Sequence, residues 1–312
     1  MVIAFEKMEQ KHNLPNLIIG GVHKAGTTSL HTYLSMHPDV CGSLIKELAF
    51  LLPARYNEAV PSNEIYATHF KHYNGEKYVL ETTPSYLYGG LPLINTIDER
   101  LGYDVKIIFI LREPTDRFIS FYRHCLTKLE IPSDTTLEDF ISMSAALGTK
   151  IRESDDTNHI TQGLIEGDYA TFLPLWLEHY KDRLLIIFFD ELSKDTPGVM
   201  KKICQWLNID FSFYKKEDFT IENRTANYKV AYIHKFALWL NHHTETFWRK
   251  HYKLKRVIRN IYYSINENKN AESKKETETI SKLEKMYEVS NKRLSELLKN
   301  APHINLPFWL QR

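Results

Sequence analysis

The sequence predicts a three-layer α/β fold, in which helices cover both faces of a parallel sheet. Four short apolar segments, 17–19, 77–81, 106–111 and 183–189, look like buried strands. Strands without polar alternation are typical of parallel sheets that are buried on both faces. The segments between them carry apolar residues at helical spacing, so that strands alternate with helices. In such a fold a ligand is expected at the carboxyl ends of the strands.

The first strand leads into the most informative stretch of the chain. We expect Gly20 and Gly21 to end the strand and a loop to follow. A helix then begins after Gly26 and ends near His37, because Pro38 disfavours helical backbone in the residue before it. This geometry points backbone N–H groups and the positive end of the helix dipole at one place, which favours a phosphate.

The loop is close to a Walker phosphate-binding loop but differs from it in one position. The spacing G-x-x-x-x-G is met from Gly21 to Gly26, yet Thr27 stands where the Walker lysine is expected, and the lysine is Lys24 instead. The strand 106–111 is followed by Arg112 rather than by an acidic metal ligand. An arginine attracts a second phosphate, so the pattern predicts a nucleotide site without a metal. We therefore expect a fold of the P-loop-kinase type.

The remaining segments have less distinctive patterns. The segment 167–180 reads as a helix that Pro174 interrupts. Further expectations are a short strand or turn over 39–43, short helices in an irregular segment over 53–74, helices over 136–147, 195–207 and 280–298, and a charged, loosely ordered segment over 266–279.

Composition limits the classes of partner. The 312 residues carry 40 Lys and Arg against 39 Asp and Glu, so a net charge of +1 gives no electrostatic footprint for nucleic acid. No apolar run approaches the ~18 residues of a membrane span, and the first residues lack the apolar region of a signal peptide. We expect a bacterial cytoplasmic protein, unless a Golgi membrane anchor has been removed. The sequence does not indicate the oligomeric state.

Four motifs carry a family resemblance: GVHKAGTTSL, KELAF, ETTPSYL and LREPTDRFISFYRH. Together they resemble the sulfotransferases that use 3′-phosphoadenosine 5′-phosphosulfate (PAPS), and in particular the heparan-sulfate-type branch and its bacterial relatives. The resemblance runs over residues 15–210. Thr82 stands where that family often has a lysine, and Phe172 where a histidine is frequent.

The resemblance implies roles for individual residues. Glu47 would be the general base that takes the proton of the acceptor, and Lys24 would stabilise the leaving phosphate. Arg112 and Ser120 would bind the 3′-phosphate. The expected cofactor-binding residues are His23, Lys24, Ala25, Gly26, Thr27, Thr28, Ser29, Arg112, Ser120, Arg224 and Lys229. The expected acceptor-binding residues are Lys46, Glu81, Tyr169 and, from the aromatic and polar composition of its segment, His69.

Each of these residues also has a purely structural explanation. Glu47 could pair with a neighbouring cation, Arg112 could form an ion pair with Glu113 or Asp116, and Tyr169 could belong to the core. The basic and aromatic stretch 247–260 could be a solvated helix face or a surface for an anionic glycan, a carrier protein or a membrane.

The function expected from these observations is sulfuryl transfer from PAPS, with PAP as product and without a metal. The acceptor would be a hydroxyl, or an amine, most plausibly of a saccharide. A single domain would consist of a nucleotide-binding and catalytic core over 14–230 and a helical C-terminal extension over 231–312. The alternatives are a metal-dependent P-loop kinase of small molecules and a non-catalytic PAP-binding protein.

Overall fold

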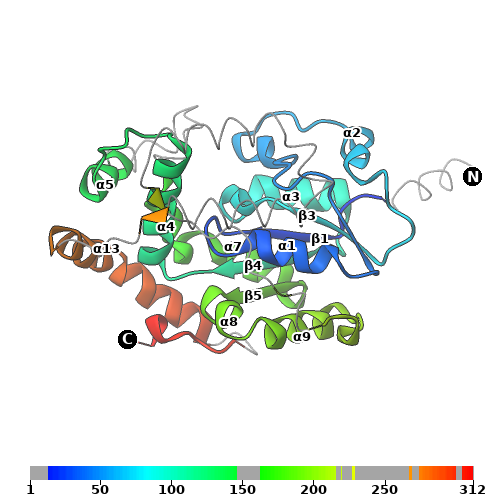
Figure 1. Ribbon diagram of the computed structural model, residues 1–312. Coiled ribbons are helices and arrows are strands. Elements are labelled where there is room, and N and C mark those ends of the chain that lie inside the picture. The colour runs from blue at the N-terminus through cyan, green and yellow to red at the C-terminus, as the bar shows by residue number, and fades with distance from the viewer. Residues whose placement is uncertain are drawn as a thin grey trace, which may run out of the picture. The chain divides into compact units, whose positions relative to one another are not determined.

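A five-stranded parallel sheet forms the centre of the protein (Figure 1). The computed structural model describes residues 13–145, 162–215, 219, 227–228, 267–268, 274–299 and 304–311. The strand order is β2-β3-β1-β4-β5, and each neighbouring pair is parallel. The strands are β1 (Leu17–Gly21), β2 (Val40–Gly42), β3 (Tyr78–Thr82), β4 (Lys106–Leu111) and β5 (Leu184–Phe188). The predicted fold class and all four apolar strands are confirmed, and the segment 39–43 contributes the edge strand β2.

The register of the sheet explains the apolar pattern of its strands. Ile18 in β1 lies opposite Glu81 in β3 on one side and Ile107 in β4 on the other. Every residue of β1 and β3 is buried, so polar alternation has no place in either strand. Because all five strands run in the same direction, the segments that follow them meet at one edge of the sheet.

Helices cover the two faces of this sheet. Helix α1 (Thr27–Ser35) packs against β1, β2 and β3 and lies in front of β1 in Figure 1. Helix α7 (Tyr169–Tyr180) lies behind the sheet, where the ring of Trp176 packs edge-on against Phe109 at a centroid distance of 5.1 Å. The other described helices of this part are α2 (Asn63–Ala67), α3 (Gly90–Leu101), α8 (Phe189–Lys194) and α9 (Thr196–Leu207).

Three sequence expectations about element boundaries are wrong. Strand β1 runs through Gly20 and Gly21 instead of ending before them. A Cβ atom at Gly20 would lie 2.8 Å from the ring of Phe109. Packing against an aromatic ring, rather than a strand end, therefore requires this glycine. Helix α7 continues past Pro174, which lies on its exposed side. Helix α13 (Lys274–Lys299) begins inside the segment 266–279 that we expected to be loosely ordered.

Contacts divide the chain into two units. The first comprises Met1–Arg117, Glu166–Asn223 and Tyr287–Arg312, and it contains the sheet. The second comprises Phe118–Ile165 and Arg224–Met286. Helices α4 (Pro114–Lys128) and α13 run across this division. The expected boundary at residue 230 therefore stays a prediction.

The second unit is described only in part. Its aromatic cluster joins α4 to α5 (Leu137–Ala145), since Phe118, Phe121 and Tyr122 all pack around Phe140 at centroid distances of 5.2–5.7 Å. The described strands β6 (Asn227–Tyr228) and β7 (Glu267–Asn268) are antiparallel. The basic stretch 247–260 lies outside the described residues.

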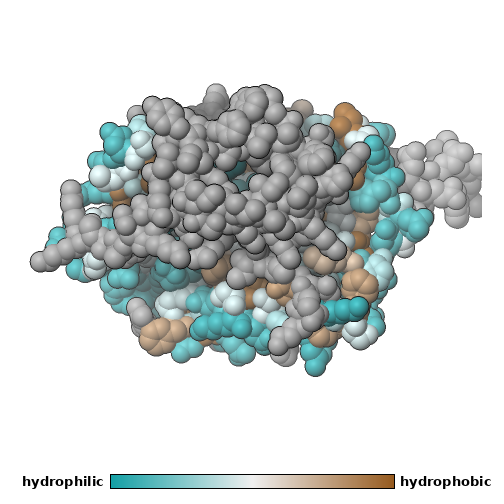
Figure 2. Space-filling view, viewed as in Figure 1, coloured by the Kyte–Doolittle hydropathy of each residue, from teal (hydrophilic) through white to brown (hydrophobic). Residues whose placement is uncertain are grey.

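The described surface is mixed in character. On the face shown in Figure 2, hydrophilic side chains predominate among the described residues, and apolar ones are scattered between them. Exposed apolar side chains include Leu44 and Ile45, which lie just after β2. Within the described ranges, no helix is both long and apolar enough to cross a membrane.

Candidate active site

The loop between β1 and α1 has the backbone geometry of an anion-binding site. Gly26, the N-cap of α1, has a φ of 89°, and Lys24 has a φ of 67°. Both values lie in the left-handed region, which glycine adopts freely and lysine rarely adopts. No side chain caps α1, and its first turn carries no acidic residue. The amides of Thr27 and Thr28 start the helix and have no acceptor within it, so they suit a phosphate.

Arg112, directly after β4, contacts this loop from the neighbouring strand. Its Nη1 donates to the carbonyl oxygen of Lys24 over 2.9 Å, and its Cζ lies 4.6 Å from the centroid of the Phe189 ring. Glu113, one of the expected ion-pair partners, instead accepts a hydrogen bond from the amide of Asp116 over 2.7 Å. Burial lowers the pKa of Arg112, although the nearby carboxylates of Asp116 and Glu113 oppose this effect.

The environment of Arg112 fits a bound phosphate. Its Nε is buried and has no hydrogen-bond partner among the residues that the structure describes. An unpaired buried donor on a charged group is costly, and an anion placed against it would remove that cost. The loop amides, Lys24 and Arg112 are therefore a donor set for a nucleotide that carries phosphates at two positions. Such a nucleotide is what the sequence predicts.

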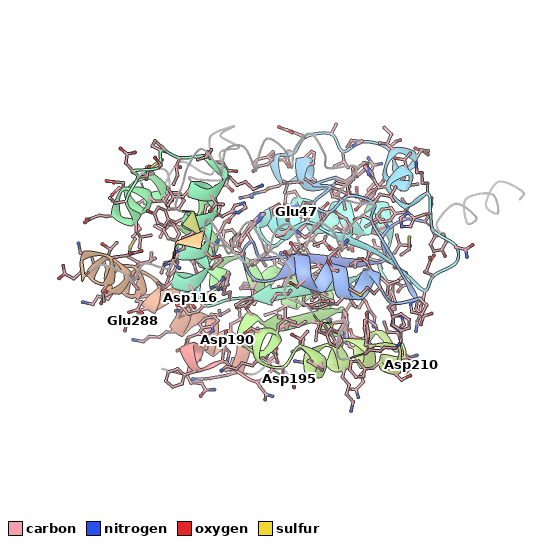
Figure 3. All side chains as sticks on the ribbon, viewed as in Figure 1. Glu47, Asp116, Asp190, Asp195, Asp210 and Glu288 are labelled. Atoms are coloured by element: carbon pink, nitrogen blue, oxygen red, sulfur yellow. The ribbon has the colours of Figure 1, made fainter. Side chains whose placement is uncertain are left out.

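Glu47 lies on the segment that follows β2. Its amide donates to the carbonyl oxygen of Thr82 over 2.8 Å, and its φ of 62° turns the backbone sharply at this residue. The carboxylate is hydrogen-bonded to Nζ of Lys46 and keeps 48% of its side chain exposed. Pairing with a neighbouring cation, the structural explanation given above, is thus present, and the side chain is also partly exposed to solvent. In Figure 3 Glu47 lies apart from Asp190 on α8, Asp195 between α8 and α9, and Asp210 after α9.

Two histidines, His23 in the phosphate loop and His31 on α1, lie near Glu47. His23 is half-buried, and burial lowers its pKa. The carboxylates of Glu166 and Glu47 act in the opposite direction, whereas the cation of Lys46 lowers the pKa further. These electrostatic effects mean that Glu47 and Lys46 lie near His23, and the neutral imidazole is favoured. The structure therefore brings Lys46, Glu47 and the loop residue His23 together.

His31 is a residue of the site that sequence reasoning missed. Its Nδ1 shares a hydrogen bond of 2.9 Å with Oγ1 of Thr82, on the neighbouring strand β3. Burial and the cation of Lys46 lower the pKa of His31 to about 4. The threonine that replaces the lysine frequent in the family thus has a defined partner. The only feature of the sequence that could have pointed to His31 is its position one turn into the helix that follows the phosphate loop.

Glu81, an expected acceptor-binding residue, has no exposed surface. Its carboxylate accepts hydrogen bonds from Oγ1 of Thr83 over 2.5 Å, from the hydroxyl of Tyr66 over 2.6 Å and from that of Tyr86 over 3.1 Å. Burial raises the pKa of Glu81, and these hydrogen bonds oppose the increase. In this structure the carboxylate can affect an acceptor only through its neighbours. A role in acceptor binding stays a prediction.

The other predicted residues lie at different depths. Tyr169 is fully buried, and its hydroxyl donates to the carbonyl oxygen of Arg112 over 2.8 Å. The carbonyl oxygen of His69 accepts from the amide of Leu44 over 3.1 Å, and its ring is partly exposed. Ser120 lies on α4, partly exposed. Arg224 and Lys229 lie outside the described residues.

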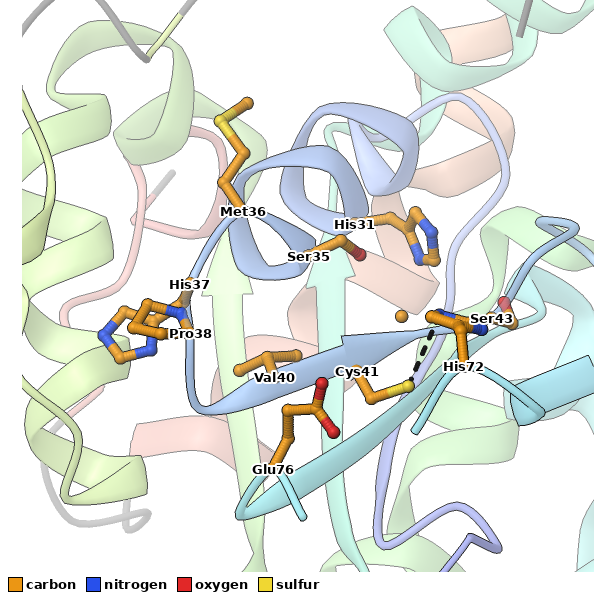
Figure 4. Close-up of a pocket in the computed structure, with 11 residues that line it drawn as sticks. His31, Ser35, Met36, His37, Pro38, Val40, Cys41, Ser43, His72 and Glu76 are labelled. Carbon is orange, nitrogen blue, oxygen red and sulfur yellow. Dashed lines mark hydrogen bonds between the residues drawn. The ribbon is translucent and has the colours of Figure 1, made fainter. Parts of the chain in front are cut away.

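A pocket of about 370 Å³ lies beside this site, between α1 and β2 (Figure 4). Ser35, Cys41 and His72 line it, and Nε2 of His72 lies 3.4 Å from Sγ of Cys41. His31 also lines the pocket, and its hydrogen bond to Thr82 joins the pocket wall to the end of β3. Most of the lining comes from the stretch 31–43, which runs from the second half of α1 to just past β2, away from the phosphate loop.

A parallel sheet with an anion-binding loop, an arginine on the next strand and an exposed carboxylate defines a nucleotide-dependent transferase. The model of the family described as "Sulfotransferase domain" matches residues 14–260, which is most of the chain. The chain belongs to this sulfotransferase family. The predicted resemblance to the PAPS-dependent sulfotransferase family is confirmed.

Individual relatives agree with this assignment. The chain is similar to the "Bifunctional heparan sulfate N-deacetylase/N-sulfotransferase 1" of Caenorhabditis elegans, with 28% identity over 214 residues, which cover 65% of this chain and 23% of the relative. The corresponding enzyme 2 of Homo sapiens is 27% identical over 212 residues, covering 63% and 22%. The chain thus spans about a quarter of the length of these curated relatives.

A solved structure supports the fold. A sulfotransferase from Alicyclobacillus acidocaldarius superposes with a TM-score of 0.57 at 24% identity, covering 67% of this chain and 86% of the other. This similarity extends the family match to the three-dimensional arrangement of the sheet and its helices.

Proposed function

We propose that this protein transfers the sulfuryl group of PAPS to an amine or hydroxyl of a saccharide, with PAP as product. The proposal is supported by the hydrogen bond between Arg112 and Lys24 and by the bond from the amide of Glu47 to Thr82, all at the carboxyl edge of one parallel sheet. The loop and Arg112 offer donors for two phosphates, and Glu47 offers a base. The names of the relatives, which are heparan sulfate N-sulfotransferases, favour an amino group on a glycan as acceptor.

The residues divide the chemistry between them. PAPS, when bound, supplies the activated sulfuryl group. Glu47 takes the proton of the acceptor while the acceptor nitrogen or oxygen forms its bond to sulfur. The bond from sulfur to the 5′-phosphate breaks, and its electron pair stays on the phosphate oxygen. Lys24 and the first amides of α1 stabilise that charge, and Arg112 holds the 3′-phosphate.

Arg112 also gives the site its selectivity for the nucleotide. A 3′-phosphate distinguishes PAPS from ATP, so a buried guanidinium with an unpaired Nε favours the former. In P-loop kinases an acidic metal ligand follows the corresponding strand. Here β4 is followed by Arg112 instead. These features and the family match favour a sulfotransferase over a metal-dependent kinase.

Calorimetric titration tests the nucleotide site. PAP should bind tightly with or without Mg²⁺, and ATP should bind more weakly in both cases. Binding of ATP that requires Mg²⁺, with no preference for PAP, would contradict the proposal and support the kinase. Binding of PAP without any transfer from radiolabelled PAPS would instead support the non-catalytic PAP-binding protein.

A matched pair of acceptors tests the chemistry. We expect label to be transferred from PAPS to an N-desulfated heparan-type oligosaccharide, and much less to the same oligosaccharide after N-acetylation. Equal labelling of both would show that a hydroxyl is the acceptor.

A cytoplasmic location, which the sequence predicts, stays a prediction.

A further inference from the structure

The buried carboxylate of Glu81 has a specific arrangement of partners. It lies on β3 among apolar residues, and its described partners are the three hydroxyls of Tyr66, Thr83 and Tyr86. Burying an ionisable group in a sheet is costly unless its hydrogen bonds are satisfied. A leucine would fill the same space without this cost, so the carboxylate calls for an explanation beyond packing.

Two of the three hydroxyls hold the segment 46–51 by its backbone. Oγ1 of Thr83 accepts a hydrogen bond from the amide of Ala49 over 3.1 Å. The hydroxyl of Tyr86 accepts one from the amide of Leu51 over 3.0 Å. Each hydroxyl therefore accepts a hydrogen bond from the segment and donates one to Glu81.

The third hydroxyl belongs to a residue that holds the same segment by its ring. The rings of Tyr66 and Phe50 stack at a centroid distance of 4.0 Å with an interplanar angle of 5°. All three partners of Glu81 thus contact three successive residues of the segment, 49–51, by two hydrogen bonds and one stacked ring pair.

The segment needs such support because its backbone is strained. Glu47 has a φ of 62° and Ala49 a φ of 51°, in the left-handed region that residues with a Cβ rarely adopt. Conformations of this kind persist only where the surroundings enforce them. The amide of Glu47 itself bonds to the carbonyl oxygen of Thr82, next to Thr83.

We propose that Glu81 is a positioning residue, which fixes the segment 46–51 through Tyr66, Thr83 and Tyr86 and so places the carboxylate of Glu47. This inference rests on the proposed function, in which Glu47 is the base. It assigns to Glu81 an indirect role, in place of a direct contact with the acceptor. The inference depends on the direction of the hydrogen bonds. Because the carboxylate of Glu81 accepts from the hydroxyls of Thr83 and Tyr86, the lone pairs of these hydroxyls face the amides of the segment 46–51.

The first test is the substitution Glu81→Gln. The amide has nearly the same shape but carries two donors, one of which must turn toward a hydroxyl and compete with an amide of the segment. We expect kcat to fall about 10- to 100-fold with the affinity for PAP changed less than about twofold, because misplacing a base affects turnover and not cofactor binding. Hydrogen exchange at residues 49–51, measured without nucleotide, should accelerate about tenfold.

A second pair of variants covers the case in which Glu81→Gln does not fold. Thr83→Val keeps the shape of the side chain but removes the hydroxyl, and should show the same loss of kcat and the same faster exchange. Thr83→Ser keeps the hydroxyl and should restore both. A matched control is Asp98→Asn, a substitution of another buried carboxylate, which bonds to Nε2 of His179 over 2.7 Å far from this segment in sequence. It should lower stability but leave kcat and exchange at 49–51 unchanged.

The two readouts separate this inference from the proposed function. Unchanged kcat and unchanged exchange in Thr83→Val would overturn the positioning role, as would an equal effect of Asp98→Asn. If the wild-type chain transfers no sulfuryl group at all, the proposed function fails, yet the exchange rates still decide whether Glu81 holds the segment.

Discussion

Nη1 of Arg112 donates a hydrogen bond of 2.9 Å to the carbonyl oxygen of Lys24, across 88 residues of sequence. This bond ties the end of β4 to the phosphate loop that follows β1. In the proposed function Lys24 serves the 5′-phosphate and Arg112 the 3′-phosphate. The guanidinium of Arg112 therefore connects the proposed binding sites of the two phosphates. The ring of Phe189 lies against this guanidinium.

The first prediction concerns this guanidinium. Arg112→Lys should weaken PAP binding about 10- to 100-fold, because a lysine cannot bond to the carbonyl of Lys24 and present a planar second donor at the same time. Binding of adenosine 5′-phosphate, which lacks the 3′-phosphate, should weaken much less. Calorimetric titration of both nucleotides measures the two effects.

Arg183→Lys is a matched control for this substitution. Arg183 also donates to a carbonyl oxygen, that of Val105 over 3.3 Å, and lies 4.8 Å from the centroid of the Tyr180 ring. It precedes β5 and so lies at the opposite edge of the sheet from Arg112. Nucleotide affinity should be unchanged in this variant. Equal losses of PAP and adenosine 5′-phosphate affinity in Arg112→Lys would mean that Arg112 acts through Lys24 and not on the 3′-phosphate.

The second prediction concerns the proposed base. Glu47→Gln should lower kcat about 100-fold or more while PAP affinity stays within about twofold, because the amide cannot take the proton of the acceptor. Glu58→Gln, a substitution at an exposed position in the same part of the chain, should leave both constants unchanged. Near-normal turnover of Glu47→Gln would remove Glu47 from the mechanism and turn attention to His23 as the base.

Much of the site was predictable because strand order and strand ends follow from local patterns. Arg112 comes directly after an apolar strand and Lys24 lies in the loop that follows another, and the parallel arrangement brings such positions to one edge. The contacts of Glu81 were not predictable in the same way. Hydroxyls and amides of Thr83, Tyr86 and the segment 46–51 meet only in the tertiary structure, and their residue types are common in cores.

The errors have a related physical cause. A glycine next to a strand can end it, or can allow a ring to pack against it, and the sequence alone does not distinguish the two at Gly20. A histidine one turn into a helix can be exposed or bonded to a neighbouring strand, as His31 is to Thr82. In both cases the deciding residue lies far away in the sequence.

The third prediction is a pH dependence of stability from His31. Its pKa is about 4 in the folded chain, against 6.5 in the unfolded chain. Between these values the unfolded state binds a proton that the folded state does not, so the free energy of unfolding rises with pH, by at most about 1.4 kcal/mol per pH unit for one residue. Above pH 6.5 this contribution is constant, and it is lost as the pH falls toward 4.

Urea unfolding between pH 4 and pH 7 measures this contribution. The free energy of unfolding of His31→Asn should rise less steeply with pH than that of the wild-type chain. Thr32→Ala is a substitution of the next residue on α1, whose hydroxyl donates to the carbonyl oxygen of Thr28 over 3.0 Å. It removes no titratable group and should keep the wild-type slope. Identical slopes for His31→Asn and the wild type would show that the pKa of His31 is not lowered in the folded chain.

The fourth prediction concerns the close packing of Gly20 under Phe109. Gly20→Ala would place a Cβ atom 2.8 Å from Cε1 of Phe109, in a fully buried layer where that ring also contacts Trp176. Overpacking of this kind should lower the free energy of unfolding by about 1–3 kcal/mol. In Gly75→Ala, nothing lies within 4 Å of the new Cβ atom, and only the φ of 94° opposes it. That variant should lose about 1 kcal/mol.

A double-mutant cycle decides whether the ring is the cause. Phe109→Leu removes the atom that the new methyl group would meet, so that Gly20→Ala should cost less in the Phe109→Leu background than in the wild type. The two residues are in contact, and we expect an interaction energy of about 1 kcal/mol or more from urea unfolding of the four proteins. If the two effects simply add, the strain comes from the backbone of β1, and the packing explanation for this glycine is wrong.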